Sequence, residues 1–199
     1  MKLSIKKEII FLELNEVNHQ VIKRYSQKSK RFSNLIKNFH IYSTRSYDQV
    51  HLSPWITWPT VHRGVNFDKH KIQNLGQDLS YANKKFPNIW ESLSKNGKRV
   101  GIYGSLHTSL MPDSLKNYDF YVPDPFSEHS QCFPRKLEPI QDFQLKLSRK
   151  SSRNVDKSIG GKKAITIFIS LLKNGLSFQT FIKIIYQLLI EKCFKGLLN

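Results

Sequence analysis

A helix followed directly by a strand, within residues 86–104, constrains the fold of this chain more than any other feature. Residues 86–96 (FPNIWESLSKN) have a helical pattern, with Pro87 near the start and Gly97 at the stop. Residues 98–104 (KRVGIYG) then have the composition of a strand. Alternation of helices and strands is typical of α/β folds, so we expect a parallel sheet here.

Other segments continue this alternation. Residues 8–14 (EIIFLEL) are rich in β-branched and aromatic side chains and predict a buried strand, and residues 19–38 follow a helical period. Two more short strands are predicted at 39–47 and at 118–122. The whole pattern predicts an α/β fold, with a mostly parallel sheet flanked by helices.

Polar residues follow several of the predicted strands. In open α/β sheets, ligands bind outside the carboxyl ends of the strands. This rule places three segments on one rim of the sheet: Asn15-Glu16, Ser105 to Thr108 and Pro123 to Phe126. Residues 50–66, which contain two prolines and a glycine, predict a structured loop with a short helix near Thr60 to Arg63.

The character of the chain changes after residue 127. A loop, a polar and weakly helical segment and two apolar helices are predicted, at 127–139, 141–154, 164–172 and 177–194. We therefore divide the chain into 1–127, which holds the α/β region, and 128–199, a loop and helical extension that would act as a cap or an insert. The apolar helices are too short and too charged to span a membrane.

Those apolar helices each need a partner, because they are apolar around much of their circumference. A second polypeptide, or self-association through residues 164–194, would provide one. Lys183 and Lys192 lie among apolar residues, so a membrane surface is a less favoured alternative.

Charge and cysteine content indicate which partners and which compartment to expect for the chain. Its 32 lysines and arginines exceed its 15 acidic residues and give a net charge of +17. The basic residues are dispersed, and no nucleic-acid-binding motif is present, so a solvated surface is favoured over a nucleic-acid partner. Cys132 and Cys193 are expected to be free thiols. The apolar run at 9–14 is too short and too charged for a signal peptide, which favours a cytoplasmic protein.

Two segments hold residues that suit catalysis or metal binding. Glu13, Asn15 and Glu16 offer the oxygen atoms that hard cations or zinc bind, although a solvated loop that caps the next helix fits these residues as well. Walker A, GxGxxG, GxSxG and HExxH motifs are all missing from the sequence.

The second segment, residues 53–72 (SPWITWPTVHRGVNFDKHKI), contains hydroxyl, histidine and arginine side chains. A hydroxyl nucleophile such as Thr57 or Thr60 needs a base or a metal to take its proton, and Arg63 suits a phosphate or sulfate group. An ordinary turn with packed tryptophans fits the segment equally well. His107, after a predicted strand, is a candidate anion contact or a solvated loop histidine.

Five segments, taken in order, resemble the N-terminal half of the alkaline phosphatase superfamily, which includes phosphodiesterases, sulfatases and phosphoglycerate mutases. They are IIFLELNEVN, FSNLI, TWPTVHRGVNFDKHKI, NIWESLSKNGKRVGIYGS and YDFYVPDPFS, and they lie within residues 8–127. The resemblance implies a metal-dependent hydrolase of small anionic phosphate or sulfate esters, with zinc, manganese or magnesium as the cofactor.

The resemblance also implies roles for individual residues. It places Asn15, with Glu16 and Glu13 beside it, at the metal, and makes Thr57 the first candidate for the nucleophile, with Thr60 as the alternative. The substrate would be bound by Arg63, His62 and His107.

Two departures from the family pattern affect the expected activity. Asn15 stands where the family has a metal-binding aspartate, and after residue 127 the only histidine is His129. Family members take further aspartate and histidine ligands from the second half of a chain about twice this length. We therefore expect a truncated or partial hydrolase, with a non-catalytic remnant or binding module as the alternative.

Overall fold

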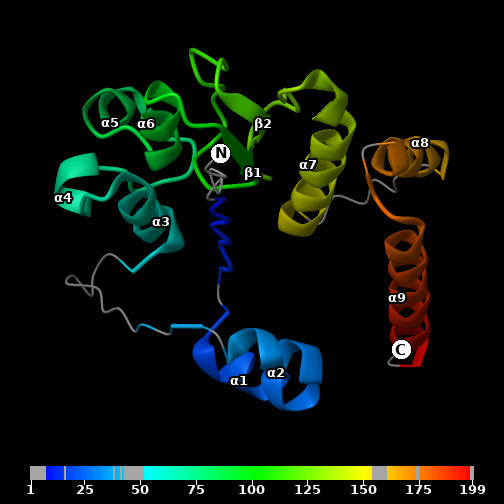
Figure 1. Cartoon of the computed structure of the whole chain (residues 1–199). Coiled ribbons are helices and arrows are strands. Elements are labelled where there is room, and N and C mark those ends of the chain that lie inside the picture. The colour runs from blue at the N-terminus through cyan, green and yellow to red at the C-terminus, as the bar shows by residue number, and fades with distance from the viewer. Residues whose placement is uncertain are drawn as a thin grey trace, which may run out of the picture. The chain divides into compact units, whose positions relative to one another are not determined.

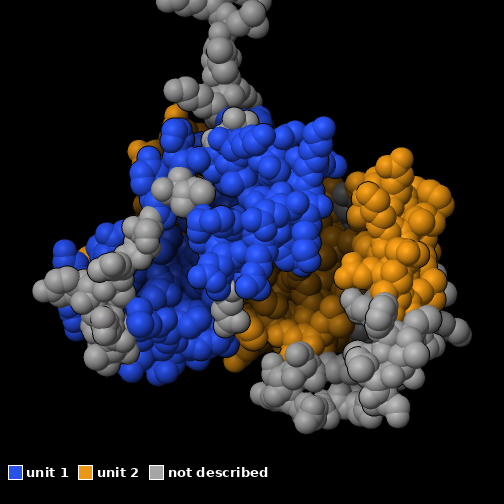
Figure 2. Space-filling view, turned by 90° about the horizontal axis from the view of Figure 1, so that it is seen from below, with its two compact units in different colours: residues 1–82 blue, residues 83–199 orange. Residues whose placement is uncertain are grey.

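The computed structural model describes residues 8–15, 17–37, 39–40, 42, 52–153, 161–173 and 175–197. It divides into two compact units, residues 1–82 and 83–199 (Figure 2). This division falls earlier in the chain than the boundary at residue 127 that we placed from composition. The assignment of domains 1–127 and 128–199 stays a prediction.

Unit 1 contains short helices, shown in Figure 1: α1 (His19–Lys28), α2 (Lys30–Ile36), α3 (Pro54–Arg63), α4 (Phe67–His70) and the beginning of α5 (Ser80–Lys85). Asn18 caps α1, because its Oδ1 accepts a hydrogen bond of 3.0 Å from the Val21 amide. The helical period predicted for 19–38 is confirmed, with a break at Ser29. A small cluster of Ile72, Leu79 and Ala82 forms buried core in this unit.

The strand predicted at residues 8–14 is wrong. The segment has no regular secondary structure, and Ile9 and Ile10 are 91% and 92% exposed. A strand gains stability from ladder hydrogen bonds to a neighbour, and an unpaired one is not stable in water. The strand predicted at 39–47 lies mostly outside the described residues, and residues 39, 40 and 42 are not in a strand.

Unit 2 contains the sheet. Helix α6 (Ile89–Lys95) is followed by β1 (Val100–Tyr103) and β2 (Tyr118–Val122), which pair in parallel with Ile102 opposite Tyr121. The predicted helix, both predicted strands and their parallel direction are confirmed. The chain therefore has a small two-stranded parallel sheet among helices, which is compatible with the α/β class.

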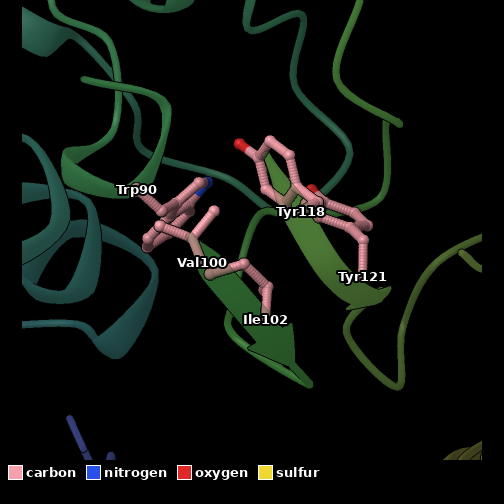
Figure 3. Packing of buried hydrophobic residues seen from close by; sticks show 5 residues of the cluster. All are labelled: Trp90, Val100, Ile102, Tyr118 and Tyr121. Carbon is pink, nitrogen blue, oxygen red and sulfur yellow. The ribbon is translucent and has the colours of Figure 1, made fainter. Parts of the chain in front are cut away.

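The core of unit 2 lies between α6 and the sheet. Five buried residues make this core, and their side chains face one another in Figure 3: Trp90, Val100, Ile102, Tyr118 and Tyr121. Elsewhere on the sheet, the Phe120 ring lies against Gly101, where an added Cβ atom would meet the ring at 2.4 Å. Only glycine leaves room for the ring at this position.

After β2 and the loop that follows it, the described part of unit 2 is mainly helical. A 3₁₀ turn (η1, Arg135–Leu137) leads into α7 (Glu138–Arg153), and α8 (Gly161–Lys173) and α9 (Phe178–Leu197) follow. The two predicted apolar helices and the segment predicted to be weakly helical are thus confirmed as helices. None of the helices in the described residues is long and apolar enough to cross a membrane.

Candidate functional site

Helix α3 carries most of the residues singled out for chemistry in unit 1. Ser53 begins it, because the Ser53 hydroxyl accepts a hydrogen bond of 3.4 Å from the Trp55 amide and Pro54 occupies the first turn. Gly64 ends it in the left-handed conformation (φ 64°). The sequence predicted a loop with a short helix near 60–63, and the structure instead continues the helix through Pro59.

A proline at this position is tolerated for a local reason. Pro59 has no amide hydrogen to donate one turn back, and its ring crowds the carbonyl group there, but Pro59 and Ile56 are both buried. Burial of these side chains offsets the missing hydrogen bond. Thr57, Thr60, His62 and Arg63 therefore all lie on one continuous helix.

The N-terminal segment meets α3 through Glu13. Its Oε1 atom lies 2.8 Å from His62 Nε2, across 49 positions of sequence. The His62 side chain is 2% exposed and that of Glu13 is 20% exposed, so water screens this pair poorly. A carboxylate at this distance orients the imidazole ring.

Asn15 makes a second contact to the same side of α3. Its Oδ1 accepts a hydrogen bond of 3.3 Å from Trp58 Nε1. The Trp58 and His62 rings stack, with their centroids 5.8 Å apart and their planes 24° from parallel. The end of the apolar segment and the helix are thus joined at two consecutive turns.

These donors do not complete a metal site. Glu13 and His62 are a carboxylate and an imidazole, both ligands that zinc accepts, and Asn15 adds a neutral oxygen. A catalytic zinc takes three protein ligands, and no group of three histidine, cysteine or acidic residues suitable for a metal occurs in the described part of the chain. Glu16, another predicted ligand, lies outside the described residues.

Thr60 lies on a different side of α3, where it meets His70 of α4. Thr60 Oγ1 is 3.0 Å from His70 Nε2 and 3.0 Å from the Ile56 carbonyl oxygen. His70 is 1% exposed, and its Nδ1 atom accepts a hydrogen bond of 3.0 Å from the Ile72 amide. The three contacts together decide how the hydrogens are placed.

The hydrogen placement makes His70 a poor base for Thr60. A neutral imidazole has one N–H and one bare nitrogen, and the bare nitrogen here is Nδ1, because it accepts from an amide. Nε2 therefore carries the hydrogen and donates it to Thr60, which donates its own hydrogen to Ile56. A base that removes the Thr60 proton would need a bare nitrogen on that side.

Thr57 lies between these two faces of the helix. At 3.6 residues per turn, Thr60 is about 160° around α3 from both Trp58 and His62, whereas Thr57 is about 100° from Trp58. Thr57 is half-buried, and within the described residues its hydroxyl makes no hydrogen bond. Of the two candidate nucleophiles, Thr57 has the hydroxyl that is available for reaction.

The predicted substrate-binding residues are all buried. His62, Arg63 and His107 are 2%, 9% and 8% exposed. His62 and Arg63 belong to α3 in unit 1, whereas His107 belongs to unit 2. An ester that reaches the first two must enter the interior of unit 1.

In unit 2, the carboxyl ends of the two parallel strands meet as the sheet rule predicted. The segment after β1 and the segment after β2 are joined by reciprocal hydrogen bonds: the Thr108 amide donates to Asp124 Oδ2, and the Asp124 amide donates to Thr108 Oγ1, each at 3.0 Å. His107, in the left-handed conformation (φ 62°), adjoins this pair. Two of the three predicted rim segments therefore lie side by side.

In this second polar group, neighbouring residues of unit 2 donate hydrogen bonds to the oxygen atoms of Asp124. Asp124 is 1% exposed, its Oδ1 also accepts from the Phe126 amide at 2.9 Å, and Gln141 of α7 donates to its carbonyl oxygen at 3.0 Å. Burial raises the pKa of the Asp124 carboxyl, while the amide hydrogen bonds and the charge of His107 oppose that rise. These bonds hold the two loops together.

Comparison with family models, with curated proteins and with solved structures found no match to this chain.

Sequence reasoning missed His70 and Trp58 as partners of the candidate site. His70 follows Phe67 and Asp68 in a four-residue helix. The hydrophobic pattern did not predict this helix, because one turn is too short to show a period. Trp58 was expected only in the core, and its indole N–H in fact binds Asn15. The sequence feature that could have identified these two residues is a tryptophan or histidine in a hydroxyl-rich segment. Each carries a polar atom that needs a hydrogen-bond partner when the side chain is buried.

Proposed function

We propose that unit 1 carries the nucleophile side of a hydrolase site for phosphate or sulfate esters, with Thr57 as the nucleophile. The observation that carries this proposal is the pair of contacts from Glu13 to His62 and from Asn15 to Trp58. They bring together the two motifs that the superfamily resemblance assigns to one site, although more than 40 residues separate them in sequence.

Attack by Thr57 would form a bond from its Oγ1 to phosphorus or sulfur and release the alcohol of the ester. Water would then cleave the threonine ester and restore the hydroxyl. Thr57 needs a group that takes its proton, and no side chain in the described residues binds its hydroxyl. In the proposal, the group that takes this proton belongs to residues outside the described part of the chain or is supplied by the added metal.

The test is turnover of an aryl phosphate, a phosphodiester and an aryl sulfate, with zinc, manganese or magnesium added in turn. We expect Thr57→Ala to abolish turnover, Thr57→Ser to keep part of it because the hydroxyl remains, and Thr60→Ser to keep most of it. Absence of turnover by the wild-type chain with every metal would reject the proposal for this chain.

A non-catalytic binding module is the second candidate. It is favoured by Asn15 in place of a charged ligand and by donors too few for a metal site in the described residues. This module would bind inorganic phosphate or sulfate near α3 without hydrolysing esters. Calorimetric binding that survives Thr57→Ala, together with no turnover, would favour this candidate over the hydrolase.

A further inference from the structure

Helix α9 exposes a continuous apolar stripe. Five large apolar residues of the helix lie within about 100° of one another around its axis and are solvent-exposed: Phe178, Ile182, Ile185, Tyr186 and Leu189. Phe178 and Tyr186 are 68% and 65% exposed. We call these five residues the α9 stripe.

The stripe is not the side by which α9 packs on its own unit. That side carries Phe181, which is half-buried and makes an edge-to-face contact with Phe168 of α8 at 5.1 Å. Lys183 lies about 60° beyond Tyr186 and so flanks the stripe, and Gln187 lies about 100° beyond Tyr186. The described part of α9 therefore has three faces: the exposed apolar stripe, the side that packs through Phe181, and a polar side.

Charge decides what kind of surface fits the stripe. Residues 161–199 contain six lysines and one acidic residue, Glu191, within a chain of net charge +17. A second copy of the chain would bring the same positive charge, which opposes association. A nucleic acid would satisfy the charge but not the five apolar side chains. A bilayer that contains anionic lipids satisfies both.

We propose that α9 lies on the surface of anionic membranes, with the α9 stripe inserted among the lipids and the neighbouring lysines against the headgroups. The helix carries lysines along its length and does not span the bilayer, consistent with the finding that none of the described helices can. This inference stands apart from the proposed hydrolase, because it uses no residue of α3.

The test is co-sedimentation of the whole chain with vesicles of phosphatidylcholine alone and with vesicles that also contain phosphatidylserine. We expect binding only to the second kind, and weaker binding as salt is added. Leu189→Ser should lower the partition coefficient by about tenfold, as expected when a large apolar side chain no longer leaves water. Leu110→Ser is the matched control, since Leu110 is 63% exposed, Leu189 is 57% exposed, and Leu110 lies outside α9.

A second variant tests the electrostatic contribution to vesicle binding. Lys183→Glu should weaken binding to phosphatidylserine vesicles several-fold and leave the helical circular dichroism unchanged. Three results would overturn the proposal: no binding at low salt, equal binding to both vesicles, or equal binding by Leu189→Ser and Leu110→Ser. A wild-type dimer that Leu189→Ser converts to a monomer, without lipid binding, would instead identify a second copy as the partner.

Discussion

Two segments of this chain follow the same sequence pattern and differ in structure. Residues 118–122 and residues 8–14 are both apolar runs that precede a polar residue, Asp124 in one case and Asn15 in the other. The first segment is β2, paired with β1, and the polar residue after it is 1% exposed. The second is not in a strand and is largely exposed, and Glu13 and Asn15 contact His62 and Trp58 of α3.

This difference suggests that the polar group around Asp124 is structural, whereas the polar group on α3 is a candidate for catalysis. Around Asp124, backbone amides and Gln141 use the oxygen atoms, so the group holds two loops together. Around α3, the Thr57 hydroxyl stays available within the described residues.

Asp124→Ala should destabilise unit 2 strongly. It leaves the buried Thr108 amide without an acceptor and removes the acceptor of Phe126, for a combined loss of about 3 kcal/mol in the free energy of unfolding. Urea denaturation followed by circular dichroism measures the loss. Asp124→Asn, which keeps one oxygen, should lose less, and an equal loss in both variants would show that the amide hydrogen bonds do not hold the loops.

Thr60→Val should destabilise unit 1 by about 1–2 kcal/mol, because the buried His70 N–H loses its acceptor while the shape of the side chain is kept. Thr57→Val, the matched control on the same helix, should cost less than about 0.5 kcal/mol. Thermal unfolding of both variants makes the comparison. If Thr57→Val proves the more damaging substitution, Thr57 is the structural threonine and the two roles are reversed.

Glu13→Ala should loosen the N-terminal segment, with a cost of about 1 kcal/mol for the lost contact to His62. We expect proteases to cleave between residues 8 and 15 several-fold faster. Glu8→Ala changes a carboxylate of the same segment that is exposed, and it should leave the cleavage rate unchanged. Equal rates for the two variants would mean that the Glu13 contact does not hold the segment.

The pH dependence of unit 2 should show a small effect of Asp124. Burial raises its pKa, so the folded unit binds this proton more tightly than the unfolded chain does. The free energy of unfolding should therefore fall as the pH rises from the ordinary value of 3.8 through the higher pKa of the folded state. Asp124→Asn should lack the part of this fall that comes from the Asp124 carboxyl. If the free energy of unfolding of the wild type instead rises relative to that of the variant over the same pH range, the prediction is wrong.

The sequence predicted the regular elements of unit 2 well. The α6 helix has Pro87 before it and Gly97 after it, and the strand β2 has a composition that local propensity decides. The rim formed by Thr108 and Asp124 followed from a topological rule that needs only parallel strands.

The sequence predicted unit 1 less well, for two physical reasons. Whether residues 8–14 form a strand depends on a pairing partner, which hydrophobic pattern alone does not identify. Whether Thr60 or Thr57 is available depends on His70, ten residues further along and brought close by a one-turn helix. Contacts of this kind come from tertiary structure and leave no period in the sequence.

Capture of a covalent intermediate would show directly which threonine reacts. The wild-type chain would be incubated with an aryl phosphate or an aryl sulfate and each metal, quenched in acid and examined by peptide mass spectrometry. The assignment of Thr57 as the nucleophile predicts a phosphorylated or sulfated threonine at Thr57 that is lost in Thr57→Ala and retained in Thr60→Ser. A modified Thr60, or no modified peptide from α3 under any of these conditions, would contradict it.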